Sequence, residues 1–137
     1  MLLTRCYKFS ASHRLHSREL SEEANQTLYG KCNNPYGHGH NYEVEVTVRG
    51  PVDRETGRVV DLDTLDALVS GLVTRPFDHR NLNEEVHEFQ QLVPTTENVV
   101  SIINQRLREA WPGVFPDRQP ALERVRIYET ARNIFEI

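Results

Sequence analysis

Two histidines separated by one glycine, His38 and His40, stand directly before a segment with strong strand character. From Tyr42 to Arg49 apolar and polar residues alternate, which is typical of a strand with one face in the core and the other in water. Side chains two residues apart in a strand project from the same face, so both histidines lie on the apolar parity. Gly39 between them removes a side chain that would otherwise oppose the pair.

A third histidine, His13, closes an earlier segment whose odd-numbered residues are mostly apolar. Three neutral imidazoles at the ends of adjacent strands suit Zn²⁺, and three protein ligands with an open fourth position are typical of catalytic zinc. A His-x-His pair also arises by chance on surface strands, so the spacing alone leaves that reading open. His16 and His87 lie in polar segments and are interpreted as solvated residues, not ligands.

Cys32 and the adjacent pair Asp78 and His79 could supply proton transfer beside such a metal. Cys32 precedes His38 by six residues in a turn rich in Asn, Pro and Gly, which can fold back over the strand. As a thiolate it could serve as a base, although a lone cysteine is also commonly a small buried apolar residue. Asp78 and His79 lie in a loop after a predicted helix, where a carboxylate and an imidazole could exchange protons or simply stabilise the turn.

Glu129 shares its parity with the apolar residues Val125 and Ile127, so a carboxylate follows two inward-facing side chains. A buried carboxylate needs hydrogen-bond donors. Either Arg126 or Arg132 supplies them, or a ligand with a pair of adjacent N–H groups does, as the edge of a pterin or guanine would.

The elements that must position these residues follow from the periodicity of the chain. Strands are predicted from about Leu3 to His13, over 40–49, and over 121–130 and 133–137, and residues 14–28 are predicted to be a long loop or a short helical piece. One helix is expected from an N-cap at Asp63 to just before Arg75-Pro76, and another from Thr95-Thr96 to just before Pro112. This order predicts a single α+β domain, residues 1–137, with two helices on one face of a four-stranded antiparallel sheet. Its other face and edges are expected to need partner subunits.

Composition narrows the classes of function. A chain of 137 residues with a net charge of −4 offers no basic surface for nucleic acid. No apolar run approaches the length that spans a bilayer, and the start has no secretory h-region, so we expect a soluble cytoplasmic protein without membrane contact. The two cysteines are expected to be thiols, and no glycine-rich dinucleotide loop is present in the sequence.

Five motifs, in order along nearly the whole chain, resemble the 6-pyruvoyltetrahydropterin synthase family: "FSASHRL", "GKCNNPYGHGHNYEVEVTV", "DHRNLN", "PTTENV" and "VRIYET". The resemblance implies the tunnelling fold (T-fold), a β-β-α-α-β-β unit that forms a trimeric barrel and, as two stacked trimers, a homohexamer. It implies that His13, His38 and His40 bind Zn²⁺, that Cys32 is the base, and that Asp78 and His79 complete a proton relay. Glu129 would anchor the pterin ring, and Thr95, Thr96 and Glu97 would line the pocket or cap a helix.

The implied activity is that of a zinc-dependent lyase. It converts the small-molecule substrate 7,8-dihydroneopterin triphosphate to 6-pyruvoyltetrahydropterin with loss of triphosphate and with no net redox change, so no other cofactor is needed. Arg14, Lys31 and Lys8 lie near the site in the sequence, but nothing in it decides which cation binds the triphosphate.

Two alternatives stay open at this stage. The first is a 6-carboxytetrahydropterin synthase of the deazaguanine pathway, whose members typically have a shorter spacing between the cysteine and the histidines than "CNNPYGHGH" gives. The second is a non-catalytic zinc-binding assembly protein, which would need a fourth ligand to close the metal site.

Overall fold

Two long strands form the centre of the molecule in the computed structural model, which describes the backbone of residues 1–137 and every side chain except that of Arg118. Strands β1 (Leu2–His13) and β2 (His38–Arg49) pair antiparallel along their whole length, from Leu2 opposite Arg49 to His13 opposite His38. Strand β4 (Ala121–Tyr128) pairs with the other side of β2, and β5 (Ile134–Glu136) pairs with β4. These four antiparallel strands are the predicted ones.

A fifth strand corrects the prediction. β3 (Arg80–Asn81) lies parallel to the end of β1, and the sheet has the order β3-β1-β2-β4-β5. Two residues carry no periodicity, so the sequence pattern could not reveal this strand. The sheet does not close on itself, because β3 covers only the last residues of β1 and β5 pairs on one side only.

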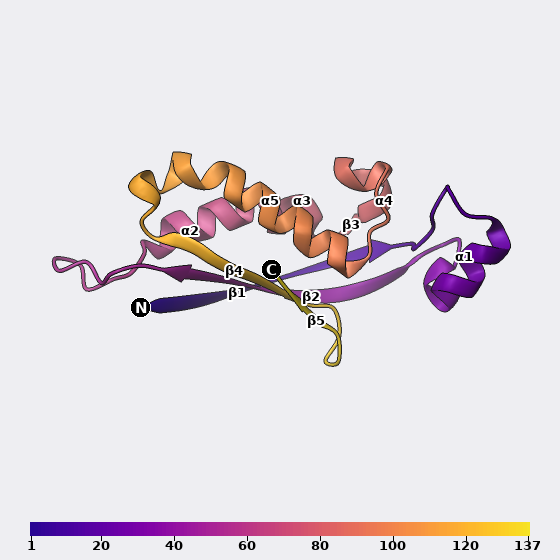
Figure 1. Cartoon of the computed structure of the whole chain (residues 1–137), viewed down its shortest axis with the longest axis horizontal. Helices are drawn as coiled ribbons and strands as arrows, with labels where there is room; N and C mark the ends of the chain where they lie inside the picture. The colour runs from indigo at the N-terminus through magenta and orange to yellow at the C-terminus, as the bar shows by residue number, and fades with distance from the viewer.

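The helices cover one face of the sheet (Figure 1), as the sequence predicts. They are α5 (Thr96–Val114) and a second rod made of α2 (Leu62–Val69), a π-helical turn (Ser70–Thr74) and α3 (Arg75–Phe77). Helix α1 (Glu22–Tyr29) lies beyond the end of the sheet where β1 finishes and β2 starts (Figure 1). The short elements are α4 (Leu82–Glu85) and the 3₁₀ turns Gly30–Asn33, His87–Gln90 and Pro116–Arg118.

The predicted boundaries of the α2–α3 rod are wrong at both ends. Its N-cap is Asp61, two residues before the predicted one, and the Asp61 carboxylate accepts from the backbone N–H of Thr64. The rod also continues through Pro76. A proline has no N–H to donate to the carbonyl four residues earlier. Here Arg106 of α5 donates to that carbonyl, on Leu72, at 3.0 Å, so a tertiary contact replaces the missing helical bond.

Helix α5 begins at its predicted cap but does not end before Pro112. It runs to Val114 and includes the proline. Its apolar stripe and the inward faces of β2 and β4 make the centre of the core, with fully buried side chains at Val44, Val46, Val48, Val99, Ile103, Leu107, Val125 and Ile127. The opposite face of the sheet carries polar side chains such as Lys8, Glu43 and Arg126 and has no helix on it.

Candidate functional site

The three predicted histidines come together at one end of the sheet. The β1–β2 register puts His13 directly opposite His38 and Ala11 opposite His40. All three imidazoles therefore project side by side from the face of the sheet that the helices cover. Their ligating nitrogens all lie within 4.8 Å of one another. His13 Nε2 and His38 Nε2 are only 3.0 Å apart. Among the described residues this arrangement has the donors and the spacing of a metal site.

The tautomer of His13 suits metal binding. Its Nδ1 lies 2.8 Å from the Pro94 carbonyl oxygen, which can only accept, so Nδ1 carries the proton and Nε2 presents a lone pair to the cluster. Burial lowers the pKa of His13 from 6.5 to about 4, and burial together with nearby His40 lowers the pKa of His38. Both rings are therefore held in the neutral form that binds metal.

The turn into β2 depends on Gly37, one of the residues that the sequence places in this turn. Gly37 has φ +72°, and a Cβ there would lie 2.9 Å from the His13 carbonyl oxygen, so both backbone angle and space require glycine. A Cβ on Gly39 would make only an ordinary contact, 3.7 Å from the Ala11 oxygen. The expectation that Gly39 is needed to avoid a side chain opposing the histidines is therefore not supported at the level of a Cβ, which this position would accommodate.

Glu129 follows β4 and reaches the histidine cluster. Its Oε1 accepts from the Thr96 hydroxyl at 2.6 Å and lies 3.7 Å from His40 Nε2. Its Oε2 has a long contact, 3.4 Å, with the Asn133 side-chain amide. The side chain is 15% exposed, so the carboxylate retains accepting capacity toward the space beside the histidines.

Arg126, one of the two arginines that the sequence offers as partners of Glu129, points to the opposite face. It bonds there to Glu136 at 2.8 Å and to Glu45 at 3.3 Å. The other, Arg132, is exposed in the loop before β5. The hypothesis of an Arg126–Glu129 ion pair is therefore wrong, and a ligand is the better remaining partner.

The "TTE" residues at the start of α5 have three different environments. Thr95 caps the helix by accepting from Asn98 N at 3.4 Å. Thr96 is 3% exposed and orients Glu129. Glu97 is exposed on the first turn. Of the three, only Thr96 contacts a residue of the candidate site.

Cys32 lies in the 3₁₀ turn between α1 and β2 and is partly buried. Its carbonyl oxygen accepts from Leu15 N at 2.8 Å, which folds the turn back onto the chain after β1, as the sequence predicts. Its sulfur is outside the histidine group. Burial, and after it the charge of Glu129, raises the pKa of Tyr42, whose ring lies next to the histidines. Tyr42 in turn lies 3.4 Å from His13 Nδ1 and was not identified from the sequence as part of the site.

Asp78 and His79 form a pair next to the edge strand β3 and are not part of the histidine group. The His79 Nδ1 to Asp78 Oδ2 distance is 2.9 Å, and Asp78 Oδ1 accepts from Ser10 N at 2.9 Å, which lowers the pKa of the carboxyl. The His79 side chain is 83% exposed. It lines a shallow hollow together with Ser12, Asn41 and His40.

Another functional candidate that the sequence did not reveal is Asn33, 5% exposed and directly after Cys32. Its side-chain amide nitrogen donates to Leu15 O at 2.7 Å and to His16 Nδ1 at 3.0 Å. Its backbone carbonyl oxygen accepts from Arg14 Nε at 3.1 Å. It fixes the Cys32 turn to the segment after His13. Its flanking polar residues gave no periodic signal that could mark it as buried.

Fold and site together define an α+β protein with three clustered imidazoles and a partly buried carboxylate at one end of an open sheet. The family model for 6-pyruvoyl tetrahydropterin synthase matches residues 2–137. The chain therefore belongs to the 6-pyruvoyl tetrahydropterin synthase family, and the predicted T-fold and the prediction of an enzyme are confirmed.

Relatives with closely similar sequences support this membership. The 6-pyruvoyl tetrahydrobiopterin synthase of Poecilia reticulata is 48% identical over 96% of this chain and 86% of its own length. The human protein of the same name is 47% identical over 96% and 87%. The structure of the Caenorhabditis elegans 6-pyruvoyl tetrahydropterin synthase is 41% identical, with a TM-score of 0.89 over 100% of this chain and 94% of that one.

Proposed function

We propose that the chain converts 7,8-dihydroneopterin triphosphate to 6-pyruvoyltetrahydropterin and triphosphate, with Zn²⁺ held by His13, His38 and His40. The observation that carries the proposal is the position of Glu129. It is a partly buried carboxylate 3.7 Å from a candidate metal ligand, and it has no arginine partner among the side chains that the structure describes. A pterin has adjacent N–H groups that suit such a carboxylate, and its side-chain oxygens would then reach the histidines.

The donor set fits zinc. Three imidazole nitrogens would leave a fourth position open, and Pro94 O accepts the proton of His13 Nδ1 and so orients this ring as a ligand. When bound, Zn²⁺ would supply Lewis-acid stabilisation of charge on the substrate's side-chain oxygens. Among the described side chains, no fourth His, Cys, Asp or Glu has its ligating atom within 4.8 Å of all three histidine nitrogens, although Glu129 approaches His40, and this disfavours a closed structural site.

The protein residues would then perform binding and proton transfer. Glu129, oriented by Thr96, would fix the pterin ring through two N–H bonds. Cys32, on the turn that approaches the end of β2, would remove a proton from the substrate side chain and return it at the next carbon. Loss of triphosphate would follow as an elimination. Every electron stays in the substrate, so the reaction needs no external oxidant.

We also propose a homohexamer of two trimers. Its support is the open sheet, with unpaired strand edges at β1 and at β5 and a polar face without helices. The exposure of His79 suits such an assembly, since the Asp78–His79 pair would then complete its relay with the site of a neighbouring copy. Sedimentation analysis tests this directly, because a monomer at assay concentrations would contradict the proposal.

Identification of the product distinguishes the proposed activity from the 6-carboxy alternative. The spacing "CNNPYGHGH" favours the pyruvoyl product. The enzyme would be incubated with 7,8-dihydroneopterin triphosphate and the products identified by mass spectrometry. A pyruvoyl pterin with free triphosphate is expected, and a carboxy pterin with a two-carbon aldehyde would refute the assignment.

A further inference from the structure

A cavity of about 820 Å³ lies beside the histidine cluster and has no role in the site described above. The cavity and the candidate site are built from the same chain segments, because the residues next to three site residues line the cavity. Arg14 follows His13, Gly37 precedes His38, and Thr95 precedes Thr96. A cavity of this size is typical of ligand-binding pockets.

The register places this cavity at the far end of the site from Glu129. Glu129 follows Tyr128, which pairs with Glu43, so it lies near the Tyr42 end of the histidine cluster. Along β2 the order is then His40, His38 and Gly37, at about 3.3 Å per residue. A substrate whose ring is bound at Glu129 and whose side chain passes the histidines would therefore direct its far end toward the cavity.

Arg14 is fixed in place at this end. The Asn83 side chain accepts from Arg14 N at 2.8 Å and donates to Arg14 O at 2.9 Å, as a strand partner would. Arg14 Nε donates to Asn33 O at 3.1 Å. In the part of the chain that the structure describes, no acceptor is within hydrogen-bonding distance of its terminal Nη1 and Nη2. A partly buried guanidinium thus has four N–H donors available.

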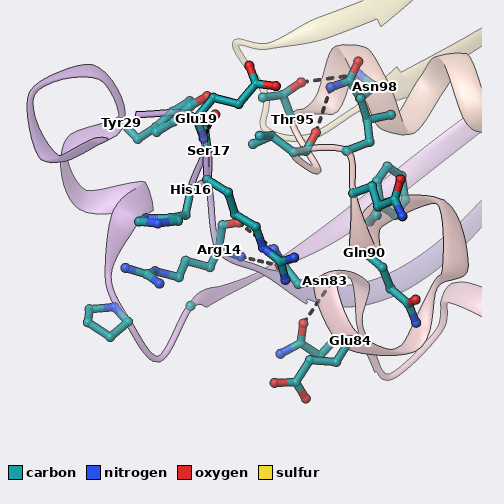
Figure 2. A pocket seen from close by; sticks show the side chains of 18 of the residues that line it. Arg14, His16, Ser17, Glu19, Tyr29, Asn83, Glu84, Gln90, Thr95 and Asn98 are labelled. Atoms are coloured by element: carbon teal, nitrogen blue, oxygen red, sulfur yellow. Dashed lines mark hydrogen bonds between the residues drawn. The ribbon is translucent and has the colours of Figure 1, made fainter. Parts of the chain in front are cut away.

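His16 adds a donor of fixed tautomer beside it. Asn33 Nδ2 donates to His16 Nδ1 at 3.0 Å, so that ring nitrogen accepts and the proton is on Nε2. Figure 2 shows the Arg14 guanidinium and the His16 ring on one wall of the cavity. Both side chains are also hydrogen-bonded to Asn33. Arg18 also lines the cavity, and the carboxylates of Glu19 and Glu84 lie toward opposite ends of it. Neither carboxylate forms an ion pair with Arg14 among the described side chains.

We infer that Arg14 and His16 form the polyphosphate subsite, with Arg14 as the main anion-binding residue. The inference rests on the proposed function for the identity of the ligand, a triphosphate ester. Arginine forks match phosphate oxygens in bidentate geometry. Asn33 ties the subsite to the turn of Cys32, so the residue that takes the proton and the residues that hold the leaving group belong to one hydrogen-bonded unit.

The other candidate cations are placed less well. Lys8 lies on the open face of the sheet, 3.8 Å from Glu43, and is 79% exposed. Lys31 is exposed in the 3₁₀ turn and does not line the cavity. Lys8→Gln is therefore a matched control, because it removes the same charge from the opposite face.

The experiment is calorimetric titration of two separate probes, inorganic tripolyphosphate and neopterin, into the zinc-loaded enzyme and its variants. Arg14→Gln should weaken tripolyphosphate binding roughly 10- to 100-fold, because charge-assisted bonds are lost. Arg14→Lys should recover part of that loss, and His16→Ala should cost roughly 2- to 10-fold for one hydrogen bond. Neopterin affinity should stay within about twofold in all of them, and Lys8→Gln should leave both affinities unchanged.

Three results would overturn the inference: no tripolyphosphate binding to the wild-type enzyme, equal affinity in wild type and Arg14→Gln, or an equal loss in Lys8→Gln. Parallel loss of neopterin binding in Arg14→Gln and His16→Ala would show a structural role and would also overturn it. The proposed function fails separately. If the wild type binds tripolyphosphate through Arg14 but does not turn over dihydroneopterin triphosphate, the activity is refuted and the anion subsite stands.

Discussion

Removal of the Glu129 carboxylate should abolish most of the affinity for a pterin while leaving the fold intact. The side chain is 15% exposed, its Oε1 is oriented by Thr96 at 2.6 Å, and its Oε2 has only a long contact to Asn133. Two charge-assisted bonds to the ligand contribute roughly 1.5–3 kcal/mol each, before the free energy of desolvating both partners is subtracted. Glu129→Ala should therefore weaken neopterin binding by at least about tenfold.

Two further variants test why the carboxylate matters. Glu129→Gln should recover little, because its amide presents an NH₂ donor to a ligand donor. Thr96→Val keeps the shape of the side chain but removes the hydroxyl that orients Glu129, so it should weaken neopterin binding about three- to tenfold, the worth of one net hydrogen bond. In the Glu129→Ala background the same substitution should have little further effect, because its target is absent.

The assay is calorimetric titration of neopterin into wild type, the three single variants and the Glu129→Ala, Thr96→Val double variant, with zinc analysis and size exclusion on each. Zinc content and assembly should match the wild type throughout. Unchanged neopterin affinity in Glu129→Ala would refute the anchor. Equal effects of Thr96→Val with and without Glu129 would refute the orienting hydrogen bond, since the two residues would then act independently.

The remaining predictions concern the metal, the proton steps and the stability of the fold. His38→Ala should remove most of the roughly one zinc per chain, because two imidazoles cannot set a tetrahedral site, and full zinc occupancy in the variant would contradict the cluster. Cys32→Ala should keep zinc while lowering the elimination rate about 10²- to 10⁴-fold, so a wild-type rate would end its assignment as the base. His79→Ala should flatten the pH–rate profile, and an unchanged profile would count against the relay. Glu88→Gln should cost roughly 1 kcal/mol at neutral pH, since Arg106 lowers the pKa of Glu88. The difference in free energy of unfolding between the wild type and Glu88→Gln is fully present above the pKa of this carboxyl in the unfolded chain. It disappears as the pH falls through the lowered pKa in the folded protein. Unfolding both proteins over a series of acidic pH values would measure it.

The sequence predicts the strands and helices whose apolar residues recur at a regular spacing, and it predicts the residues at the ends of these elements. Strand alternation located β1 and β2, and parity alone placed His13, His38 and His40 on one face. The same argument put Glu129, which directly follows β4, on the parity of the inward-facing residues Val125 and Ile127. These predictions succeed because each depends only on a local pattern and on the rule that apolar faces pack together.

Features set by tertiary contacts could not be predicted in this way. The sequence rule that a helix ends before a proline fails at Pro76, because Arg106, thirty residues later, supplies the donor that Leu72 O lacks. The burial of Asn33 depends likewise on Leu15, His16 and Arg14, which approach it only when the turn folds back. Neither contact leaves a mark on the local sequence.

The position of the candidate metal site follows from core packing rather than from the histidines themselves. The valines of β2 must face α5, and a slip of one residue in a strand would turn every one of them to the open face. The same slip would turn His38 and His40 away from the helix-covered side and move His13 out of register with His38. Because the core fixes the register, it also brings the three nitrogens within 4.8 Å of one another. Folding therefore orders the three side chains in advance. A metal ion that binds them would cost less conformational entropy than one that must first order three separate ligands.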